Sequence, residues 1–378
     1  MMVLIWSSAM MLRRFCCFST SASSSLASAP FSSLNKKRRL VFLGSPQVSA
    51  SVLDALFSAS SAPDSLFEVA AIVTQPPSGR DRGRKITPSP VAQHALDKGF
   101  PSDLIFTPVK AGEVNWGQMI TIQESFLENF KSLEPELCVT AAYGNILPSK
   151  FLKIPSLGTV NIHPSLLPLY RGAAPVQRAL EDGVKETGVS LAFTVRQLDA
   201  GPVISCQRID VDDQIKAAEL LELLFAQGSE LLLRELPFIF DGSAKRKAEE
   251  QDESKATLAP KITPKESWLS FDQEAITLHN KVRAFAGWPG TRAKVMIVDP
   301  QNGQSNTTEL KIITTRVYNG AKAQSGDADD VVFNKGSLIF PCGRQTALEV
   351  LEVQLPGKKV VNASAFWNGL RGQKLKRI

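Results

Sequence analysis

The chain is expected to fold as an α/β protein, with a doubly wound, mostly parallel sheet in its N-terminal domain and a smaller C-terminal antiparallel β-barrel (OB-like) domain. Three observations predict this arrangement. Strand and helix patterns alternate over the first two thirds of the chain, which favours a parallel sheet covered by helices. Short β-branched runs separated by Gly-containing turns fill the last third. A chain of 378 residues, 43% of them apolar, also exceeds what a single hydrophobic core usually organises.

The first 38 residues have the composition of an organelle transit peptide. They are rich in serine and contain basic but no acidic residues. Arg13 and Arg14 follow the apolar residues instead of preceding them, which argues against a secretory signal. We therefore expect residues 1–38 to be a disordered transit peptide for mitochondrial import, with a plastid as the alternative destination. A disordered tail without a targeting role is the competing interpretation.

The next part, residues 39–242, begins with the apolar strand pattern RLVFL at 39–43. Gly44-Ser45-Pro46 then predicts a tight turn, and an amphipathic pattern over 48–57 predicts a helix. Gly44 is not expected to bind a dinucleotide, because the second and third glycines of that fingerprint are missing. Further strands are expected at 67–73, 137–142 and 159–162, a β-ribbon at 189–195 and 203–209, and helices at 217–225 and 229–236, after which Asp241-Gly242 ends the domain.

Residues 243–261 hold almost no large apolar side chain and many charges of both signs, so they are expected to form a solvated linker. Residues 262–378 then show the pattern of a small antiparallel barrel. Strands are expected at 293–298, 309–317, 337–340 and 348–355, and helices at 270–286 and 363–370.

The distribution of charge bears on the partners of the chain. The net charge is +6, but residues 39–242 carry an excess of acidic residues and residues 262–378 a surplus of basic ones. A basic, β-rich domain appended to an acidic one favours a polyanion surface on the C-terminal domain over scattered, solvated lysines. The basic residues near its end are Lys358, Lys359, Arg371, Lys374, Lys376 and Arg377.

The five cysteines and three histidines are not spaced as metal ligands or as a disulfide framework. We therefore expect no metal site. After the leader, no segment reaches the roughly 18 uninterrupted apolar residues that a membrane span needs. No membrane partner is expected, and the chain is expected to be a monomer.

A polar pair at the end of an apolar strand marks the candidate site. Asn161 and His163 stand at i and i+2, so in an extended strand they point to the same face. Pro164 cannot continue a central ladder, so the strand should stop at the edge where α/β sheets bind ligands. Taken alone, His163 is more readily explained as a partly buried histidine satisfied by a backbone carbonyl. Asp199 changes that, because a carboxylate in a turn between apolar strands needs a partner, and an amide, an imidazole and a carboxylate together suit formyl transfer to an amine.

The string NIHPSLLP at 161–168, followed by LDAGPVI at 198–204, resembles the folate-dependent formyltransferase family. The resemblance extends over about residues 39–378. It implies that Asn161, His163 and Asp199 are the catalytic residues, that 10-formyltetrahydrofolate is the formyl donor, and that no metal is required. The folate pocket that it implies is lined by Ser165, Leu166, Leu167 and Pro168.

Three further strings, SLLPLYRGAAPVQRAL at 165–180, TQPPSGRDRGRKITPSPV at 74–91 and FAGWPG at 285–290, resemble the methionyl-tRNA branch of that family. They imply initiator methionyl-tRNA as the substrate and a glycine-hinged basic loop at its acceptor end, although a solvated surface loop has the same composition. The basic residues of this loop are Arg80, Arg82, Arg84 and Lys85, with Arg82 in the position of the key arginine.

Two features depart from the bacterial members of that branch. Pro164 stands where they commonly have Gly, and LDAGPVI is closer to the glycinamide ribonucleotide branch. A formyltransferase for a small amine, such as glycinamide ribonucleotide or an amino sugar, therefore remains an alternative. A non-enzymatic RNA-binding protein on the same scaffold is the alternative outside enzymes.

Overall fold

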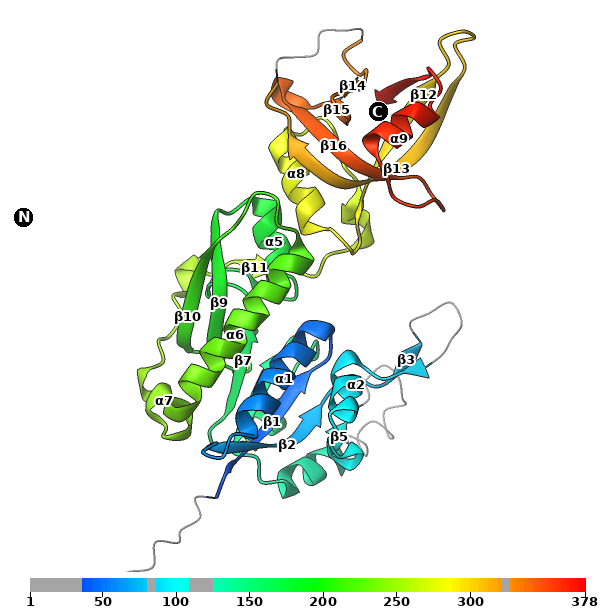
Figure 1. Cartoon of the computed structure of the whole chain (residues 1–378). Coiled ribbons are helices and arrows are strands. Elements are labelled where there is room, and N and C mark those ends of the chain that lie inside the picture. Colours follow the sequence, from blue (N-terminus) through cyan, green and yellow to red (C-terminus); the bar gives the residue numbers. More distant parts are fainter. Residues whose placement is uncertain (1–35, 80–85, 109–124, 321–326) are drawn as a thin grey trace, which may run out of the picture. The chain divides into compact units, whose positions relative to one another are not determined.

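The N-terminal domain is built on a seven-stranded sheet with the strand order β10-β9-β7-β6-β1-β2-β5 (Figure 1). The strands are β1 (Arg38–Gly44), β2 (Phe67–Val73), β5 (Ile105–Phe106), β6 (Leu137–Ala141), β7 (Thr159–His163), β9 (Glu186–Phe193) and β10 (Val203–Asp210). Neighbours among β7, β6, β1, β2 and β5 are parallel, whereas β9 is antiparallel to both β7 and β10. The predicted mostly parallel sheet and the β-ribbon at its edge are confirmed.

The structure, a computed structural model, describes residues 36–79, 86–108, 125–320 and 327–378. Both faces of its first sheet are covered. Leu40 and Phe42 of β1 pack in one core, with α1 (Gln47–Ser60) and α6 (Ala217–Phe240) over them. Val41 and Leu43, which alternate with them, pack in a second core with helical residues from 125–132 and α4 (Ser149–Leu152). Burial on both faces explains why β1 is an uninterrupted apolar run.

One prediction in this domain is wrong. The two helices expected at 217–225 and 229–236 form a single helix, α6, of 24 residues. Gly228, which lies between them, does not end the helix. A Cβ atom there would lie 2.5 Å from Cγ2 of Ile162 on β7 and 3.0 Å from Cγ2 of Val189 on β9. The absence of a side chain therefore lets the helix approach the sheet closely.

The linker segment is ordered, although most of its side chains are exposed as expected. It contains α7 (Ser243–Lys247), and Glu249 forms an antiparallel bridge to Val203. Its strand β11 (Leu258–Ala259) pairs with β8 (Arg171–Gly172) of the N-terminal domain. The segment between the domains is thus tied to the first domain by backbone hydrogen bonds.

The C-terminal domain is an antiparallel sheet with the strand order β14-β15-β16-β13-β12-β18. Its strands are β12 (Thr291–Val298), β13 (Ser305–Val317), β14 (Val332–Asn334), β15 (Ser337–Pro341), β16 (Ala347–Gln354), β17 (Val361–Asn362) and β18 (Lys374–Arg377). Residues 329–331 bond to residues 375–377 through Val331 N to Leu375 O at 2.9 Å and Arg377 N to Asp329 O at 2.9 Å. These bonds join the two ends of the sheet, so it closes on itself as the barrel prediction requires.

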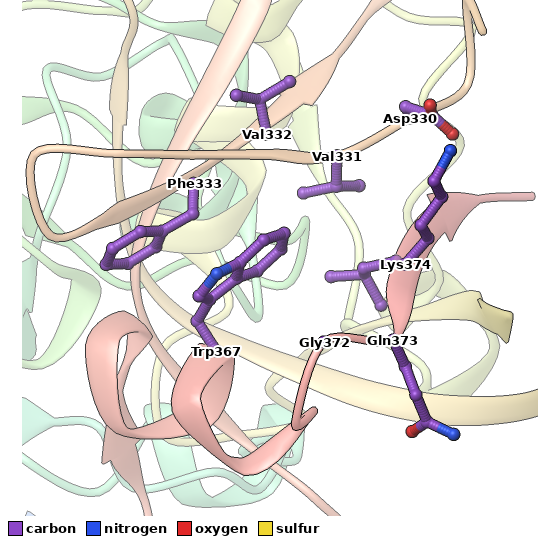
Figure 2. Close-up of a pocket in the computed structure, with 9 residues that line it drawn as sticks. Asp330, Val331, Val332, Phe333, Trp367, Gly372, Gln373 and Lys374 are labelled. Atoms are coloured by element: carbon purple, nitrogen blue, oxygen red, sulfur yellow. The ribbon is translucent and has the colours of Figure 1, made fainter. Parts of the chain in front are cut away.

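The described part of this domain also contains two α-helices and a cavity. The helix expected at 270–286 is shorter, α8 (Ala275–Ala284), because the Ala275 amide donates to Thr346 Oγ1 of the barrel at 2.9 Å and the helix begins there. The second helix is α9 (Ala363–Gly369). A cavity of about 470 Å³ is lined in part by Phe333 and Trp367, whose stacked rings have centroids 5.5 Å apart. Figure 2 shows the residues that line it. Lys374 lines the cavity, but none of the candidate catalytic or folate-binding residues does.

Candidate active site

Asn161 and His163 lie at the carboxyl end of β7, which stops at His163 as Pro164 predicts. Asn161 is paired in register with Thr140 on β6 and with Ala192 on β9. The Thr140 hydroxyl donates to Asn161 Oδ1 at 2.7 Å. Because this contact uses the amide oxygen, the Asn161 side chain presents its NH₂ group as the donor. Strand β7 therefore fixes the position of the Asn161 amide, and the hydrogen bond from Thr140 on β6 fixes its orientation.

His163 is almost completely buried, with 4% of its surface exposed. Its Nε2 atom lies 3.0 Å from the carbonyl oxygen of Tyr170. A carbonyl only accepts, so Nε2 carries a hydrogen and donates it. Nδ1 is then the ring nitrogen left to act on a ligand, and it lies 3.8 Å from Oδ2 of Asp199.

Asp199 comes from the turn between β9 and β10, far from His163 in the sequence. Its φ is +47°, in the left-handed region that a non-glycine residue occupies at a cost of order 1–3 kcal/mol. Oδ2 accepts the Gly172 N–H at 2.9 Å, and 17% of the side chain is exposed. The carboxylate is therefore held beside the imidazole while remaining accessible.

Thus Asn161, which carries the amide, the His163 imidazole and the Asp199 carboxylate lie at one edge of the sheet. An NH₂ donor and a ring nitrogen beside a carboxylate can stabilise an oxygen that becomes negative, and can hold or move a proton. This is the chemistry of attack on an acyl or formyl carbon. Among the described residues, there is no group of three or more His, Cys, Asp or Glu side chains able to hold a metal ion.

The loop expected to contact folate follows β7 directly. Ser165 is fully buried, and its hydroxyl donates to the Leu169 carbonyl at 2.6 Å, so this side chain stabilises the turn between residues 165 and 169. Ser190 on β9 fixes the same loop, because its Oγ donates to Ser165 O at 2.7 Å and accepts the Leu167 N–H at 3.1 Å. Leu166, Leu167 and Pro168 are half-buried, and Leu169 after them is exposed.

The basic loop Arg80, Arg82, Arg84 and Lys85 lies outside the described residues. The strands on either side of it, β3 (Ser78–Gly79) and β4 (Ile86–Thr87), pair as an antiparallel hairpin base. In the C-terminal domain, Lys376 is paired with Asp327 at 2.7 Å, and Arg377 with Asp329 at 2.9 Å. These two cations are therefore less available to a polyanion than the sequence suggested.

Several residues that shape the site were not singled out in the sequence. Thr140 and Ser190 are polar residues inside buried strands, which is the signal that could have found them. Arg171 was noted only as part of a string, yet it is 4% exposed and bonded to Gln251 and Glu253. Gln251 stands in the charged linker, where nothing in the pattern distinguishes it.

Further structural findings apply to the described residues. Cys138, Cys206 and Cys342 are free thiols. Burial raises the pKa of the Cys342 thiol to about 11, so it is protonated near neutral pH. None of the described helices combines the length and apolar character needed to cross a bilayer.

Comparison with known proteins identifies relatives along most of the chain. The family described as "Formyl transferase" matches residues 38–236, and "Formyl transferase, C-terminal domain" matches residues 261–371. A methionyl-tRNA formyltransferase of Bacillus licheniformis is 34% identical over 331 residues, covering 88% of this chain and 95% of the relative. One of Methylococcus capsulatus is 36% identical over 341 residues, covering 89% of this chain and 99% of the relative.

Solved structures show the same fold at low sequence identity. An N-formyltransferase from Helicobacter canadensis, in complex with folinic acid and dTDP-3-aminofucose, superposes with a TM-score of 0.56 at 14% identity and covers 83% of this chain and 98% of its own. HypX from Aquifex aeolicus, in complex with tetrahydrofolic acid, has a TM-score of 0.54 at 16% identity and covers 88% of this chain and 47% of its own.

Proposed function

The chain belongs to the methionyl-tRNA formyltransferase family, and from that premise we propose that it transfers the formyl group of 10-formyltetrahydrofolate to the α-amino group of methionyl-initiator tRNA. The chain is a formyl-transferring enzyme by its two family domains. The observation that carries the finer proposal is the meeting of His163 and Asp199, 3.8 Å apart, at the end of the strand that holds Asn161.

The proposed reaction is a direct transfer. The neutral methionyl amine attacks the formyl carbon, and the resulting tetrahedral intermediate carries a negative oxygen. The NH₂ group of Asn161 and Nδ1–H of imidazolium His163 donate to that oxygen. Removal of one such donor typically costs about 2.7–4 kcal/mol of transition-state stabilisation. Esterification of methionine lowers the basicity of its amine, so more of the nucleophile is neutral.

Asp199 acts on the charge and the proton in this scheme. Its carboxylate lies 3.8 Å from Nδ1 of His163, where it attracts the positive charge that the ring carries in this scheme. It also accepts the proton that leaves the attacking amine, through a water molecule, and the proton then passes to the departing folate nitrogen. The Gly172 N–H holds the carboxylate in place for both tasks.

Two observations support a folate donor, namely the apolar residues that follow His163 in the chain and the folates present in structures of similar fold. Leu166, Leu167 and Pro168 are half-buried apolar residues of the loop that follows His163, and apolar side chains suit the flat face of a pterin. Ser165 contributes by holding the turn beneath them. The structures of similar fold that contain folinic acid and tetrahydrofolic acid are consistent with a folate in this family's fold.

The tRNA substrate is supported by two basic regions. The loop of Arg80, Arg82, Arg84 and Lys85 follows the strand β2, whose carboxyl end lies at the same sheet edge as that of β7. Basic side chains such as those of this segment can pair with phosphates of an acceptor stem. The surplus of basic residues in 262–378 supplies the second region.

The organellar role is proposed from the leader. The family match begins at residue 38, so the serine-rich, basic residues before it lie outside the domain. We propose that they direct import into the mitochondrion. Fusion of residues 1–38 to a fluorescent protein in plant cells, which contain both organelles, should give a mitochondrial signal. A plastid or diffuse signal would contradict this destination.

The central test is an assay of product identity. The purified full chain is offered 10-formyltetrahydrofolate with charged initiator methionyl-tRNA, glycinamide ribonucleotide or a dTDP-amino sugar in parallel. We expect formylmethionyl-tRNA as the main product. Formylation of either small amine at a higher kcat/KM would replace the proposal with a small-amine formyltransferase, and binding of tRNA without any formyl transfer would favour the RNA-binding alternative.

A further inference from the structure

We propose that the interdomain segment 251–259, here called the strap, is a working part of the active site, and that Gln251 is the positioning residue through which it acts. The inference rests on the proposed function for its reaction, but its evidence is the set of contacts between the strap and the two loops that flank His163. No side chain of the strap needs to touch the reacting atoms. Its role is to fix the backbone that carries Asp199 and Tyr170.

Gln251 clamps the turn that presents Asp199. Its Nε2 atom donates to the carbonyl oxygen of Asp199 at 2.8 Å and to that of Gly201 at 2.7 Å. One amide group therefore uses both of its hydrogens on two carbonyls of the same turn. Asp199 has a φ of +47°, a conformation that persists only where the surroundings impose it. Gln251 supplies that restraint from outside the loop.

Arg171 fixes the orientation of the Gln251 amide. Its guanidinium is 4% exposed, and Nε and Nη2 donate to Gln251 Oε1 at 3.0 and 2.8 Å. The same guanidinium donates to both carboxylate oxygens of Glu253 at 2.9 and 2.8 Å. A guanidinium only donates and the two turn carbonyls only accept, so only one orientation of the amide satisfies all partners.

The strap also holds the backbone of Tyr170, the second partner of His163. Tyr170, whose carbonyl accepts the His163 Nε2–H, also has a left-handed φ, of +59°. Its N–H donates to Thr257 Oγ1 at 2.8 Å, and the Arg171 N–H donates to Thr257 O at 2.9 Å. Both hydrogen-bonding groups of the Tyr170 backbone are thereby committed, one to the strap and one to His163.

Gly172 connects the two halves of this arrangement. It pairs with Ala259 of β11, and a Cβ atom at Gly172 would lie 2.6 Å from the Ala259 carbonyl oxygen. The approach is therefore possible only for glycine, and it places the Gly172 N–H 2.9 Å from Asp199 Oδ2. Thus the strap touches the chain segments that hold both partners of His163, namely Asp199 and Tyr170.

These contacts predict a specific kinetic effect. Reacting groups must be held within a fraction of an ångström, and a displacement of about 1 Å can cost a hundredfold in rate. Thr257 of the strap also bonds to the proposed folate loop, because its N–H donates to Pro168 O at 3.3 Å. The side chain of Gln251 bonds instead to Arg171, Asp199 and Gly201. Substitution of Gln251 should therefore lower kcat and leave KM for both substrates nearly unchanged.

The test compares two substitutions of Gln251 in the full chain. Gln251→Met keeps the length of the side chain and removes all its hydrogen bonds. Gln251→Glu keeps an acceptor for Arg171 but removes the donor to the Asp199 and Gly201 carbonyls. Glu250→Gln is the matched control, because Glu250 is an exposed neighbour that bonds to no site residue within the described part of the chain. Steady-state kinetics with both substrates and thermal melting are measured for all three variants and the wild type.

We expect both Gln251 variants to lower kcat about ten- to a hundredfold, with KM within about twofold of the wild type and with the melting transition retained, and Glu250→Gln to behave as wild type. A wild-type kcat in Gln251→Glu would overturn the proposal, as would a loss of activity that merely follows a loss of folded protein. If the wild type does not formylate methionyl-tRNA, the proposed function fails on that observation alone, and the same comparison is then made with the amine that it does formylate.

Discussion

Nδ1 of His163 lies 3.8 Å from Oδ2 of Asp199, while Nε2 of the same ring donates to a backbone carbonyl at 3.0 Å. The ring is therefore held from one side, and its other nitrogen faces the carboxylate. The separation is longer than a hydrogen bond but short enough for a strong charge interaction in a site that is largely buried. It leaves room for Nδ1–H to turn toward a developing oxyanion.

This relationship predicts the effect of removing either group. His163→Ala should lower kcat by about 10²–10³, the usual loss for one oxyanion donor. Asp199→Asn should lower it by about 10²–10⁴, because the charge is lost while asparagine still tolerates the left-handed backbone and accepts the Gly172 N–H. Circular dichroism and thermal melting check that both variants fold. Near-normal turnover in either folded variant would end the assignment of the site.

The orientation of Asn161 gives a second prediction. Thr140→Val preserves the shape of the side chain but removes the hydroxyl that donates to Asn161 Oδ1 at 2.7 Å. The amide is then free to present its oxygen to the site, and one hydrogen bond of about 1 kcal/mol is lost, so kcat should fall about five- to tenfold. Thr140→Ser keeps the hydroxyl and should retain activity. Equal activity of the Val and Ser variants would show that Thr140 does not orient the amide.

The parts of the fold that were predicted from sequence are those with a local physical signal. The strands β1 and β2 are apolar on both faces and bounded by turns, and this pattern depends little on the rest of the chain. Asn161 and His163 were found because polar residues ending an apolar strand are costly without a role. The short strands β17 and β18 were missed because they form through pairing with distant strands rather than from their own residues.

The positioning residues were missed for a related reason. Gln251 lies in a charged stretch that reads as a solvated connector, and its contacts with Asp199 and Gly201 exist only after the chain has folded back on itself. Gly228 lies between the two helices expected at 217–225 and 229–236, and glycine usually weakens helices. Its actual role depends on Ile162, a residue on another element, which no helical pattern reveals.

Gly228 supplies a prediction about stability. Gly228→Ala improves helix propensity by about 0.5–1 kcal/mol, but the new methyl would meet Ile162 Cγ2 at 2.5 Å, and overpacking of a core typically costs about 1–3 kcal/mol. Stability to chemical denaturation should therefore fall by about 1–2 kcal/mol. Gly369→Ala in α9, where an added Cβ has no neighbour within 4 Å, is the control and should be neutral or slightly stabilising. A stabilised Gly228→Ala variant would mean that the helix can move away from the sheet without cost.

His279 of α8 predicts a dependence of stability on pH. Its Nε2 donates to Asp213 O at 2.8 Å, and its Nδ1 accepts from Thr315 Oγ1 at 2.9 Å. Burial lowers its pKa below the ordinary 6.5, and the charge of Arg283 lowers it further, against the opposing effect of the Asp213 carbonyl. As pH falls below about 6.5, the unfolded chain therefore binds a proton at His279 more readily than the folded chain does.

The stability contributed by neutral His279 should therefore be fully present above its unfolded pKa and lost as pH falls from about 6.5 toward the folded pKa. His279→Gln can keep one donor and one acceptor but does not titrate. The melting temperature of the wild type should fall more steeply than that of His279→Gln between about pH 7.5 and 5.5. Parallel melting curves over this range would mean that His279 remains neutral in the unfolded chain or charges freely in the folded one.

The last prediction concerns which C-terminal cations bind tRNA. Lys374 and Lys376 lie two residues apart on β18, but Lys376 is paired with Asp327 at 2.7 Å and with Asp330 at 3.4 Å, whereas Lys374 is exposed and has no ion pair within the described part of the chain. A cation that is already neutralised releases few counterions from tRNA. Lys374→Gln should therefore weaken tRNA binding and reduce the slope of log affinity against log salt by about one.

Lys376→Gln is the matched control, since it removes the same charge from the same strand. It should change tRNA affinity much less at about 0.15 M salt, where unpaired distant charges are screened, although it leaves two carboxylates uncompensated and should lower the melting temperature slightly. Binding is measured by titration of labelled tRNA at several salt concentrations. Equal losses of affinity in the two variants would show that tRNA binding responds only to the net charge of the domain. An affinity that does not depend on salt would contradict an electrostatic contact with tRNA.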